Sequence, residues 1–380
     1  MKKLNIDRLD WLSFLNGLVF YAPVALLVRT NAGVTTTQFF ILQAVLSLTI
    51  FIFEIPTGML TDKIGYKPTM ILAQCILFLS KILLLIAYQR CCLFLFVVEA
   101  VAEGIAICFL SGTQDAYVYS MYSKDHYAVK MAHISNFGTA GFIVSTLLYV
   151  VLYHFGEIRV LLIATIIANS IGILCVIEIA QEPKLETAHS NKTNIMTVLT
   201  NIDMVLLILL NAGFSIAFLL IHFFFVDKLL VCGLHEVWMS PIIISYSIVQ
   251  MLAEKLLDQM QWIHYRTAMF VSILVSGALM IGFAQSQTAE IVVLIMIMLP
   301  LFLSFSEFIL NSMENVLIDH YRQENKRATI LSTANMVSNL IEIVFLFASA
   351  FIAGVGIFAC FIGAGIIIMF FGTIIFLRKR

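Results

Sequence analysis

The segment Phe51-Ile52-Phe53-Glu54-Ile55-Pro56-Thr57-Gly58-Met59-Leu60-Thr61-Asp62-Lys63-Ile64-Gly65-Tyr66-Lys67-Pro68 decides the fold of this chain. An apolar run ends near Gly58, a charged turn follows, and a second apolar run begins after Pro68. Gly58 allows a neighbouring backbone to approach closely. Asp62 can accept hydrogen bonds from the N-terminus of a helix, where the helix dipole favours an anion. The pattern predicts a tight charged turn between two membrane helices, and its lysines favour the cytoplasmic side.

The composition agrees with a membrane protein. Of the 380 residues, 61% are hydrophobic and only 12% are charged, and the chain contains 31 Phe and 17 Met. No soluble core needs that much apolar surface. The net charge of -1, without a basic patch or a recognition motif, argues against nucleic acid as a partner.

Twelve segments reach the length of about 20 apolar residues that a membrane-spanning helix needs. They cover residues 10–29, 37–60, 69–88, 93–120, 130–154, 158–180, 200–227, 236–257, 267–285, 290–318, 328–352 and 355–377. We therefore predict an all-α membrane protein with an N-terminal six-helix bundle (1–180), a polar cytoplasmic linker (181–197) and a C-terminal six-helix bundle (198–380). An offset of 196 residues carries Asp62 to Asp258 and Ala132 to Ala328, which favours a duplicated six-helix unit.

The distribution of basic residues predicts the orientation. With twelve helices, 17 basic residues fall on the side of both termini and the linker, and Lys81 lies within a helix. The opposite side holds 4, which are Arg29, Arg90, Arg159 and Lys228. Basic residues gather on the cytoplasmic side of a membrane protein, so both termini are expected there. The first apolar segment lacks a signal-peptide cleavage site and is expected to be the first helix.

The turn resembles the signature between helices 2 and 3 of the major facilitator superfamily, which runs Gly-x-Leu-x-Asp-Arg-x-Gly-Arg-Arg/Lys. The matching residues are Gly58, Leu60, Asp62, Gly65 and Lys67, while Lys63 and Tyr66 replace the first two arginines. The resemblance implies two pseudo-symmetric six-helix bundles that transport by alternating access. It also implies a gating role for Gly58, Asp62, Lys63, Gly65, Lys67 and, at the end of helix 4, Asp115.

Four further segments resemble one branch of that superfamily, the bacterial exporters similar to drug:proton antiporters. They are Phe20-Tyr21-Ala22-Pro23, Phe53-Glu54-Ile55-Pro56-Thr57-Gly58, Ser111-Gly112-Thr113-Gln114-Asp115-Ala116 and Arg327-Ala328-Thr329-Ile330-Leu331-Ser332. The chain departs from that branch in two places. Ala100 stands where helix 4 often carries an arginine four residues before a glycine, and Gly138-Thr139-Ala140-Gly141 in helix 5 keeps glycines without a proline.

Two carboxylates in helix 4 are the main candidates for proton coupling. Glu99 and Glu103 lie one turn apart, and ionisable groups inside a membrane usually face a cavity or a partner. One interpretation pairs either of them with Lys81 in a structural ion pair, and the other places them in the transport cavity, because one lysine cannot neutralise two carboxylates. Two such close carboxylates should not both ionise readily, so proton and cargo can compete for one site. We predict Glu103 as the carrier, then Glu99, with Glu307 as the next candidate.

The resemblance places helices 1, 4, 7 and 10 around a central cavity. Stripes of polar and aromatic residues on these helices and on helix 11 are predicted to contact the substrate: Asn16, Phe20, Glu99, Glu103, Asn211, Phe214, Phe218, His222, Glu307, Asn311, Asn339 and Glu342. The alternative role for such residues is hydrogen bonding between helices that holds the bundle together. Walls of this composition suit an apolar or amphiphilic cargo.

We therefore expect a secondary active transporter in the cell membrane, a monomer with both termini cytoplasmic. Its partners are a small-molecule substrate, protons and the lipid bilayer, and its activity is proton-coupled export. The seven cysteines lack metal-ligand spacing, and no Gly-x-x-x-x-Gly-Lys-Ser/Thr loop or catalytic triad is present, so neither cofactor nor enzyme activity is predicted. The alternatives are an importer or facilitator of a small nutrient, a lipid flippase, and a non-transporting sensor or immunity protein with the same fold.

Overall fold

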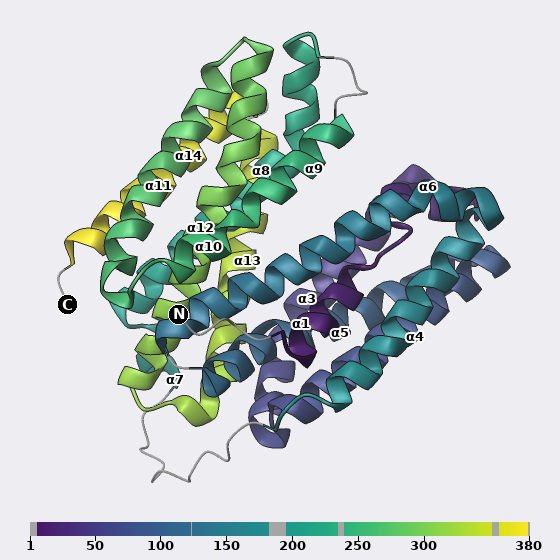
Figure 1. The fold of residues 1–380 in the computed structure, drawn as a ribbon, viewed down its shortest axis with the longest axis horizontal. Coiled ribbons are helices and arrows are strands. Elements are labelled where there is room, and N and C mark those ends of the chain that lie inside the picture. The colour runs from purple at the N-terminus through teal and green to yellow at the C-terminus, as the bar shows by residue number, and fades with distance from the viewer. Residues whose placement is uncertain (1–5, 123, 182–194, 235–238, 352–356, 379–380) are drawn as a thin grey trace. The chain divides into compact units, whose positions relative to one another are not determined.

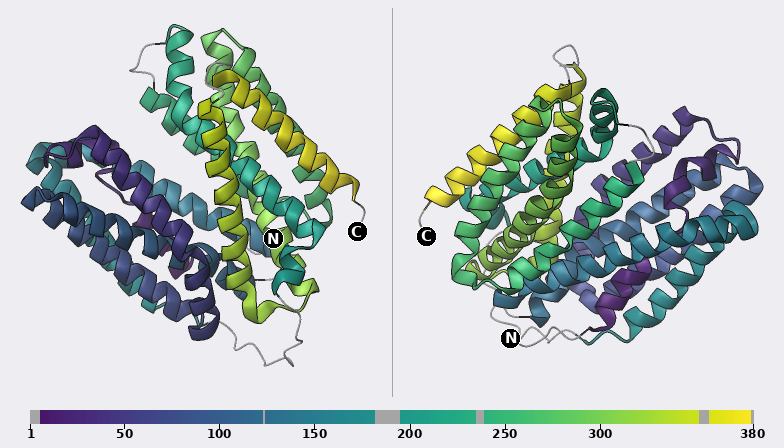
Figure 2. Two further views of the ribbon diagram at one scale, coloured as in Figure 1. Left: turned by 180° about the vertical axis from the view of Figure 1, so that it is seen from behind. Right: turned by 45° about the horizontal axis from the view of Figure 1, so that its top comes forward.

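The structure is a computed structural model that describes residues 6–122, 124–181, 195–234, 239–351 and 357–378. Within these ranges a few side chains, that of His222 among them, lie outside the description. All regular structure in the described part is helical (Figures 1 and 2). Nine helices of that part are long and apolar enough to cross a membrane. The predicted all-α membrane class is confirmed.

The N-terminal half consists of six α-helices and one short 3-10 turn. They are α1 (Arg8–Gly17), η1 (Ala22–Val24), α2 (Ala25–Thr30), α3 (Thr36–Ile64), α4 (Tyr66–Arg90), α5 (Leu93–Met121) and α6 (Lys124–Ile177). Within α6 the backbone leaves the helical conformation at Gly156 and Glu157, so α6 consists of two helices joined by a kink. This kink lies between the predicted spans 130–154 and 158–180.

The C-terminal half contains the remaining helices. They are α7 (Ile195–Leu199), α8 (Ile202–Val231), α9 (Met239–Gln250), α10 (Leu252–Asp258), α11 (Trp262–Gln285), α12 (Ala289–His320), the 3-10 turn η3 (Glu324–Lys326), α13 (Arg327–Phe351) and α14 (Ile357–Leu377). The predicted span 236–257 is divided at Met251 between α9 and α10.

The chain divides into two compact units. The first unit comprises Met1–Met121, His133–Ala188 and Asn325–Thr333, and the second comprises Tyr122–Ala132, His189–Glu324 and Ala334–Arg380. The first residues of α13 therefore belong to the first unit, and those of α6 belong to the second. The division at linker 181–197 stays a prediction, because residues 182–194 lie outside the described part of the chain.

The charged turn predicted from the sequence is the junction of α3 and α4. Thr35 and Gln38 form a capping box at the start of α3, and Gly65 ends that helix. Gly65 has φ 95, in the left-handed region that glycine enters without strain, and its N–H donates to the carbonyl oxygen of Thr61. The next helix begins at once with Tyr66. One glycine thus reverses the chain between two long apolar helices.

The first predicted helix, 10–29, is not continuous. It ends at Gly17, and the chain continues through η1 into α2. Pro23 explains the break, because proline has no N–H and its ring clashes with the carbonyl of the residue four positions earlier. The break leaves the N–H of Phe20 without a helical partner, and the hydroxyl oxygen of Thr165 accepts it at 3.2 Å.

Glycines bring α1 and α6 into backbone contact. A Cβ atom at Gly17 would lie 2.1 Å from the carbonyl oxygen of Gly138, and one at Gly141 would lie 2.1 Å from the carbonyl oxygen of Phe14. Only glycine fits at such distances, as at close helix crossings in membranes. The glycines of the Gly138–Gly141 segment therefore serve helix packing without the proline of the antiporter branch.

Candidate functional site

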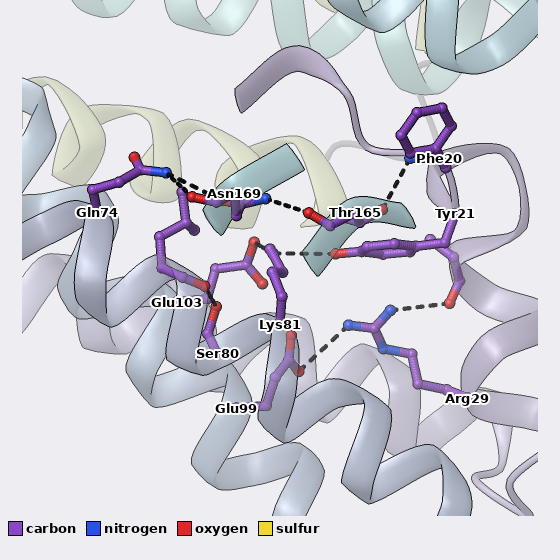
Figure 3. Close-up of polar contacts among 12 residues, drawn as sticks. Phe20, Tyr21, Arg29, Gln74, Ser80, Lys81, Glu99, Glu103, Thr165 and Asn169 are labelled. Atoms are coloured by element: carbon purple, nitrogen blue, oxygen red, sulfur yellow. Dashed lines mark hydrogen bonds and ion pairs between the residues drawn. The ribbon is translucent and has the colours of Figure 1, made fainter. Parts of the chain in front are cut away.

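An ionic cluster of five side chains, Tyr21, Arg29, Lys81, Glu99 and Glu103, lies inside the first unit (Figure 3). Tyr21 comes from the break after α1, Arg29 from α2, Lys81 from α4, and both glutamates from α5. Glu99 is 1% exposed, Lys81 4% and Arg29 6%. Charges are rarely buried to this degree unless they are paired.

Each carboxylate of the cluster is matched by a cation. The Lys81 ammonium contacts Glu103 Oε1 and donates a hydrogen bond to the Tyr21 hydroxyl oxygen at 3.1 Å. The Arg29 Nη2 atom lies 3.5 Å from Glu99 Oε2, and Nη1 of the same side chain donates to the carbonyl oxygen of Ala25 at 3.2 Å. The guanidinium of Arg29 points at Glu99 in Figure 3. Two cations and two carboxylates give the cluster no net formal charge.

Antiparallel packing of α4 and α5 brings Lys81 to Glu103. The two helices are joined at Cys91 and Cys92, and Lys81 and Glu103 each lie eleven residues from Cys92. At 1.5 Å per residue this places both side chains about 16 Å from the turn. A bilayer core is about 30 Å thick, so a turn at the bilayer surface would put the pair near the membrane centre.

The pairing of Glu99 with Arg29 corrects one step of the sequence argument. That step counted Lys81 as the single cation near the two carboxylates and placed Arg29 at the outer end of a continuous first helix. The first helix is not continuous, because the chain leaves the helical conformation before Pro23. Arg29 therefore lies on the separate helix α2, which buries it against α5. Pro23 inside an apolar segment was the signal for this break. The assignment of Glu99, Glu103 and Glu307 to proton coupling stays a prediction.

A second polar network lies beside the cluster and holds Asn16. The Asn16 and Gln74 side-chain amides donate to each other at 3.1 and 3.0 Å, and Gln74 Nε2 also donates to the carbonyl oxygen of Asn169 at 3.3 Å. Asn169 in turn donates to the carbonyl oxygen of Thr165 at 3.0 Å. The hydroxyl oxygen of Thr165 accepts the backbone N–H of Phe20 (Figure 3). In this conformation Asn16 and Phe20 face partners in their own unit, and their substrate contacts stay a prediction.

The other predicted substrate residues belong to the second unit. Asn211, Phe214 and Phe218 are on α8, Glu307 and Asn311 on α12, and Asn339 and Glu342 on α13. Phe214 is buried, and the other six are half-buried. Neither Glu307 nor Glu342 forms an ion pair with any residue that the structure describes. The side chain of His222 lies outside the described residues.

The carboxylate of Asp62 caps the start of α13 within the first unit. Asp62 Oδ1 accepts a hydrogen bond from the backbone N–H of Ala328 at 3.1 Å, and Oδ2 accepts one from the N–H of Thr329 at 2.9 Å. The Thr329 hydroxyl also donates to Oδ2. The first N–H groups of a helix lack helical acceptors, and an anion there is stabilised by the helix dipole. Hydrogen bonds from a helix N-terminus to Asp62 were predicted from the sequence, and the helix that donates them is α13.

Close packing surrounds this cap. A Cβ atom at Gly58 or at Gly112 would lie 2.8 Å from the Ser332 hydroxyl oxygen, so α3 and α5 both approach α13 closely. The guanidinium carbon of Arg327 lies 4.3 Å from the ring centre of Tyr119. These contacts and the Asp62 cap are called the α13 latch below.

The remaining predicted gating residues lie near the same turn. Lys63 is exposed, Asp115 is half-buried on α5, and Lys67 donates to the carbonyl oxygen of Ile179 at 2.7 Å. Lys67 thereby connects the start of α4 to the residues that directly follow α6. A gating function for all of these residues stays a prediction.

Comparison with known proteins identifies a family over most of the chain. The family model of the Major Facilitator Superfamily matches residues 10–346. A search of curated proteins found no match. Among solved structures, the chain is similar to the fucose:proton symporter of E. coli, with 13% identity, a TM-score of 0.77 and 97% of both chains covered.

Two further structures are similar over nearly their full length. The human organic anion transporter MFSD10 shares 12% identity at a TM-score of 0.78, with 97% of both chains covered. A bacterial homologue of the iron transporter ferroportin, in an outward-facing state, shares 12% identity at a TM-score of 0.74, covering 98% of this chain and 96% of that one. Identities this low establish a shared fold.

Proposed function

Because the chain belongs to the major facilitator superfamily and is a transporter by family and fold, we propose that it exports a small hydrophobic or amphiphilic compound in exchange for protons. Transport proceeds by alternating access. The protein acts as a monomer in the cell membrane, with both termini cytoplasmic. Phe20, Phe214 and Phe218 provide aromatic surface for such a cargo.

The observation that carries the proposal is the buried ionic cluster. Protonation neutralises the carboxylate of Glu103 or Glu99. The cation paired with it, Lys81 or Arg29, then has no counterion. A buried cation without a partner is strongly destabilised, so the freed cation must find another partner. The cluster therefore has alternative charge arrangements, and a ligand that binds one arrangement better shifts the balance between them.

Cargo and proton compete in this scheme for the same carboxylates. A cargo with a cationic or hydrogen-bonding group favours the ionised carboxylate and expels the proton, and proton binding on the other side of the membrane expels the cargo. The Tyr21 hydroxyl, which already bonds Lys81, offers that lysine a neutral contact while Glu103 is protonated. The two carboxylates act as one coupled pair, so no individual order of protonation is assigned.

The α13 latch supports the conformational part of the proposal. Its polar contacts are charge-assisted hydrogen bonds to backbone N–H groups, which are stronger than neutral ones. They join the end of α3 to a helix start that lies 266 residues later in the sequence. A contact made of a few such hydrogen bonds can break and form again during transport, as a gate requires.

A second candidate is proton-coupled import of a small polar nutrient. The fold similarity to a fucose:proton symporter favours it, because the same architecture carries that activity in that protein. A neutral cluster with paired hydrogen-bonding groups also fits a polar solute. Import and export differ in the direction of the pH gradient that drives accumulation.

Reconstituted protein distinguishes these functions. The full chain is placed in proteoliposomes, and a panel of cationic amphiphiles, neutral apolar compounds, sugars and labelled phospholipids is tested with a pH gradient of either direction. The proposal predicts gradient-dependent movement of an amphiphile opposite to the proton flow, abolished by a protonophore. Movement of a sugar in the direction of the proton flow identifies the importer, and movement of phospholipid alone identifies a flippase. Protein that binds compounds but moves none of them contradicts transport.

A further inference from the structure

A cleft of about 680 Å³ opens within the second unit, among the ends of four helices. Its walls come from α8, α11, α12 and the end of α14. The labels in Figure 1 show these four helices in one body, with α11 and α14 side by side. No residue of the ionic cluster or of the α13 latch lines the cleft.

Polar and apolar residues occupy different depths of this cleft. Asp203 is in the first turn of α8, Arg266 lies near the start of α11, His320 ends α12, and Arg378 follows α14. The apolar lining residues, such as Leu206, Val316 and Leu317, lie about one turn further into their helices. The cleft is therefore polar at the helix ends and apolar toward the bilayer core, which is the distribution of an amphiphile.

The polar end of the cleft is positively charged. Arg266 Nη2 donates to the carbonyl oxygens of Ile375 and Phe376, each at 2.8 Å, and so caps the end of α14. Arg378 Nε donates to Asp203 Oδ1 at 2.8 Å. The described residues that line the cleft include two arginines and one aspartate, and Lys379 and Arg380 follow Arg378 directly in the sequence.

Arg378 retains capacity for a further partner. Its side chain is 42% exposed, and within the described part of the chain only its Nε atom donates a hydrogen bond. A guanidinium carries five N–H donors in a planar fork that matches phosphate oxygens. An anion at the mouth of the cleft can therefore bind Arg378 while the Asp203 contact is kept.

We propose that this cleft binds an anionic phospholipid. Its phosphate contacts Arg378 at the helix ends, and part of an acyl chain lies along Leu206, Val316 and Leu317. Free phosphate would match the positive charge of Arg378 but would leave the apolar part of the cleft empty. The volume of the cleft also fits an organic ligand rather than one small ion. Anionic lipids concentrate in the cytoplasmic leaflet, and each basic residue near that surface contributes about 1 kcal/mol of attraction.

Native mass spectrometry of the full chain, released from detergent, tests the proposal. Binding of phosphatidylglycerol is compared with binding of phosphatidylcholine carrying the same acyl chains. The wild type is expected to retain phosphatidylglycerol preferentially, and Arg378→Gln to bind it roughly fivefold more weakly, because one basic contact is lost. Arg8→Gln is the matched control, since Arg8 also forms an exposed pair, with Glu178 at 2.7 Å, but lies in the first unit. It is expected to bind like the wild type.

A second variant separates the acyl-chain contact from the charge. Val316→Trp fills the apolar part of the cleft and is expected to weaken phosphatidylglycerol binding while all basic residues remain. Inorganic phosphate is the competitor that distinguishes a lipid from a free anion. The proposal is overturned if Arg378→Gln and Val316→Trp both bind phosphatidylglycerol like Arg8→Gln, or if inorganic phosphate occupies the Arg378 site without any preference for the lipid.

Discussion

The Asp62 carboxylate accepts a hydrogen bond of 2.9 Å from the backbone N–H of Thr329, which lies 267 residues later in the chain. The Ala328 N–H donates to the other carboxylate oxygen. These N–H groups belong to the first turn of α13 and have no helical acceptor. One side chain thus fixes the end of α3 to the start of α13.

Asp62→Asn should loosen this contact. Asparagine has one acceptor oxygen where the carboxylate uses two. Its neutral amide also loses the interaction of the negative charge with the helix dipole, which is worth about 0.3–1 kcal/mol. Hydrogen–deuterium exchange of residues 327–333 should become faster, and the transporter should shift toward its inward-open state. Arg8→Gln, which removes an exposed charge elsewhere in the first unit, is the control and should leave the exchange unchanged. Equal exchange in the two variants would show that Asp62 does not hold the helix start.

The packing of α1 on α6 is tested by Gly141→Ala. The new methyl group would lie 2.1 Å from the carbonyl oxygen of Phe14, and backbone cannot move aside as a flexible side chain does. Overpacking of this kind costs about 1–3 kcal/mol. The thermal unfolding temperature in detergent should fall, whereas Gly363→Ala, with no atom within 4 Å of the added Cβ, should change it little. A fall of the same size in both variants would contradict the backbone contact.

Charge pairing in the ionic cluster is tested by a double-mutant cycle. Glu103→Gln leaves the buried Lys81 without its partner, at a cost of about 3–5 kcal/mol. Lys81→Met leaves the half-buried Glu103 without its partner and should cost less, because part of that side chain reaches solvent. The double variant removes both charges and should be more stable than either single variant. Arg8→Gln breaks an exposed pair and should cost under about 1 kcal/mol. Additive effects of Glu103→Gln and Lys81→Met on thermal unfolding would indicate that the two residues do not interact.

The predicted orientation is tested by reporter fusions at Lys192 and Arg380. Both should show cytoplasmic activity, because the twelve-helix arrangement puts 17 basic residues on that side and, with Arg29 buried in the ionic cluster, three (Arg90, Arg159 and Lys228) on the other. A fusion after Cys92, between α4 and α5, should report the opposite side. Periplasmic activity at Lys192 or at Arg380 would contradict the twelve-helix arrangement.

The sequence predicts the parts of this molecule that depend on local chemistry. The length of the apolar segments predicts the membrane helices, Gly65 predicts the turn between two of them, and the Asp62 carboxylate beside that turn predicts the helix cap. Arg29 shows where such reasoning ends. Its partner Glu99 lies 70 residues away, and their contact depends on how the break at Pro23 redirects α2 toward α5. Hydrophobic periodicity predicts a buried face but does not specify which distant residue covers it. The cleft beside Arg378 was missed for the same reason, because four separate helix ends form it.

The most direct test of proton-coupled transport compares two kinds of transport in Glu103→Gln proteoliposomes. Accumulation of cargo driven by a pH gradient should be lost, because the carboxylate that exchanges its proton is gone. Exchange of labelled for unlabelled cargo at equal pH should remain, because it needs no net proton transfer. The double variant Lys81→Met with Glu103→Gln provides the same comparison without an unpaired buried lysine. Full pH-driven accumulation in Glu103→Gln and also in Glu99→Gln would contradict coupling through this cluster and direct attention to Glu307.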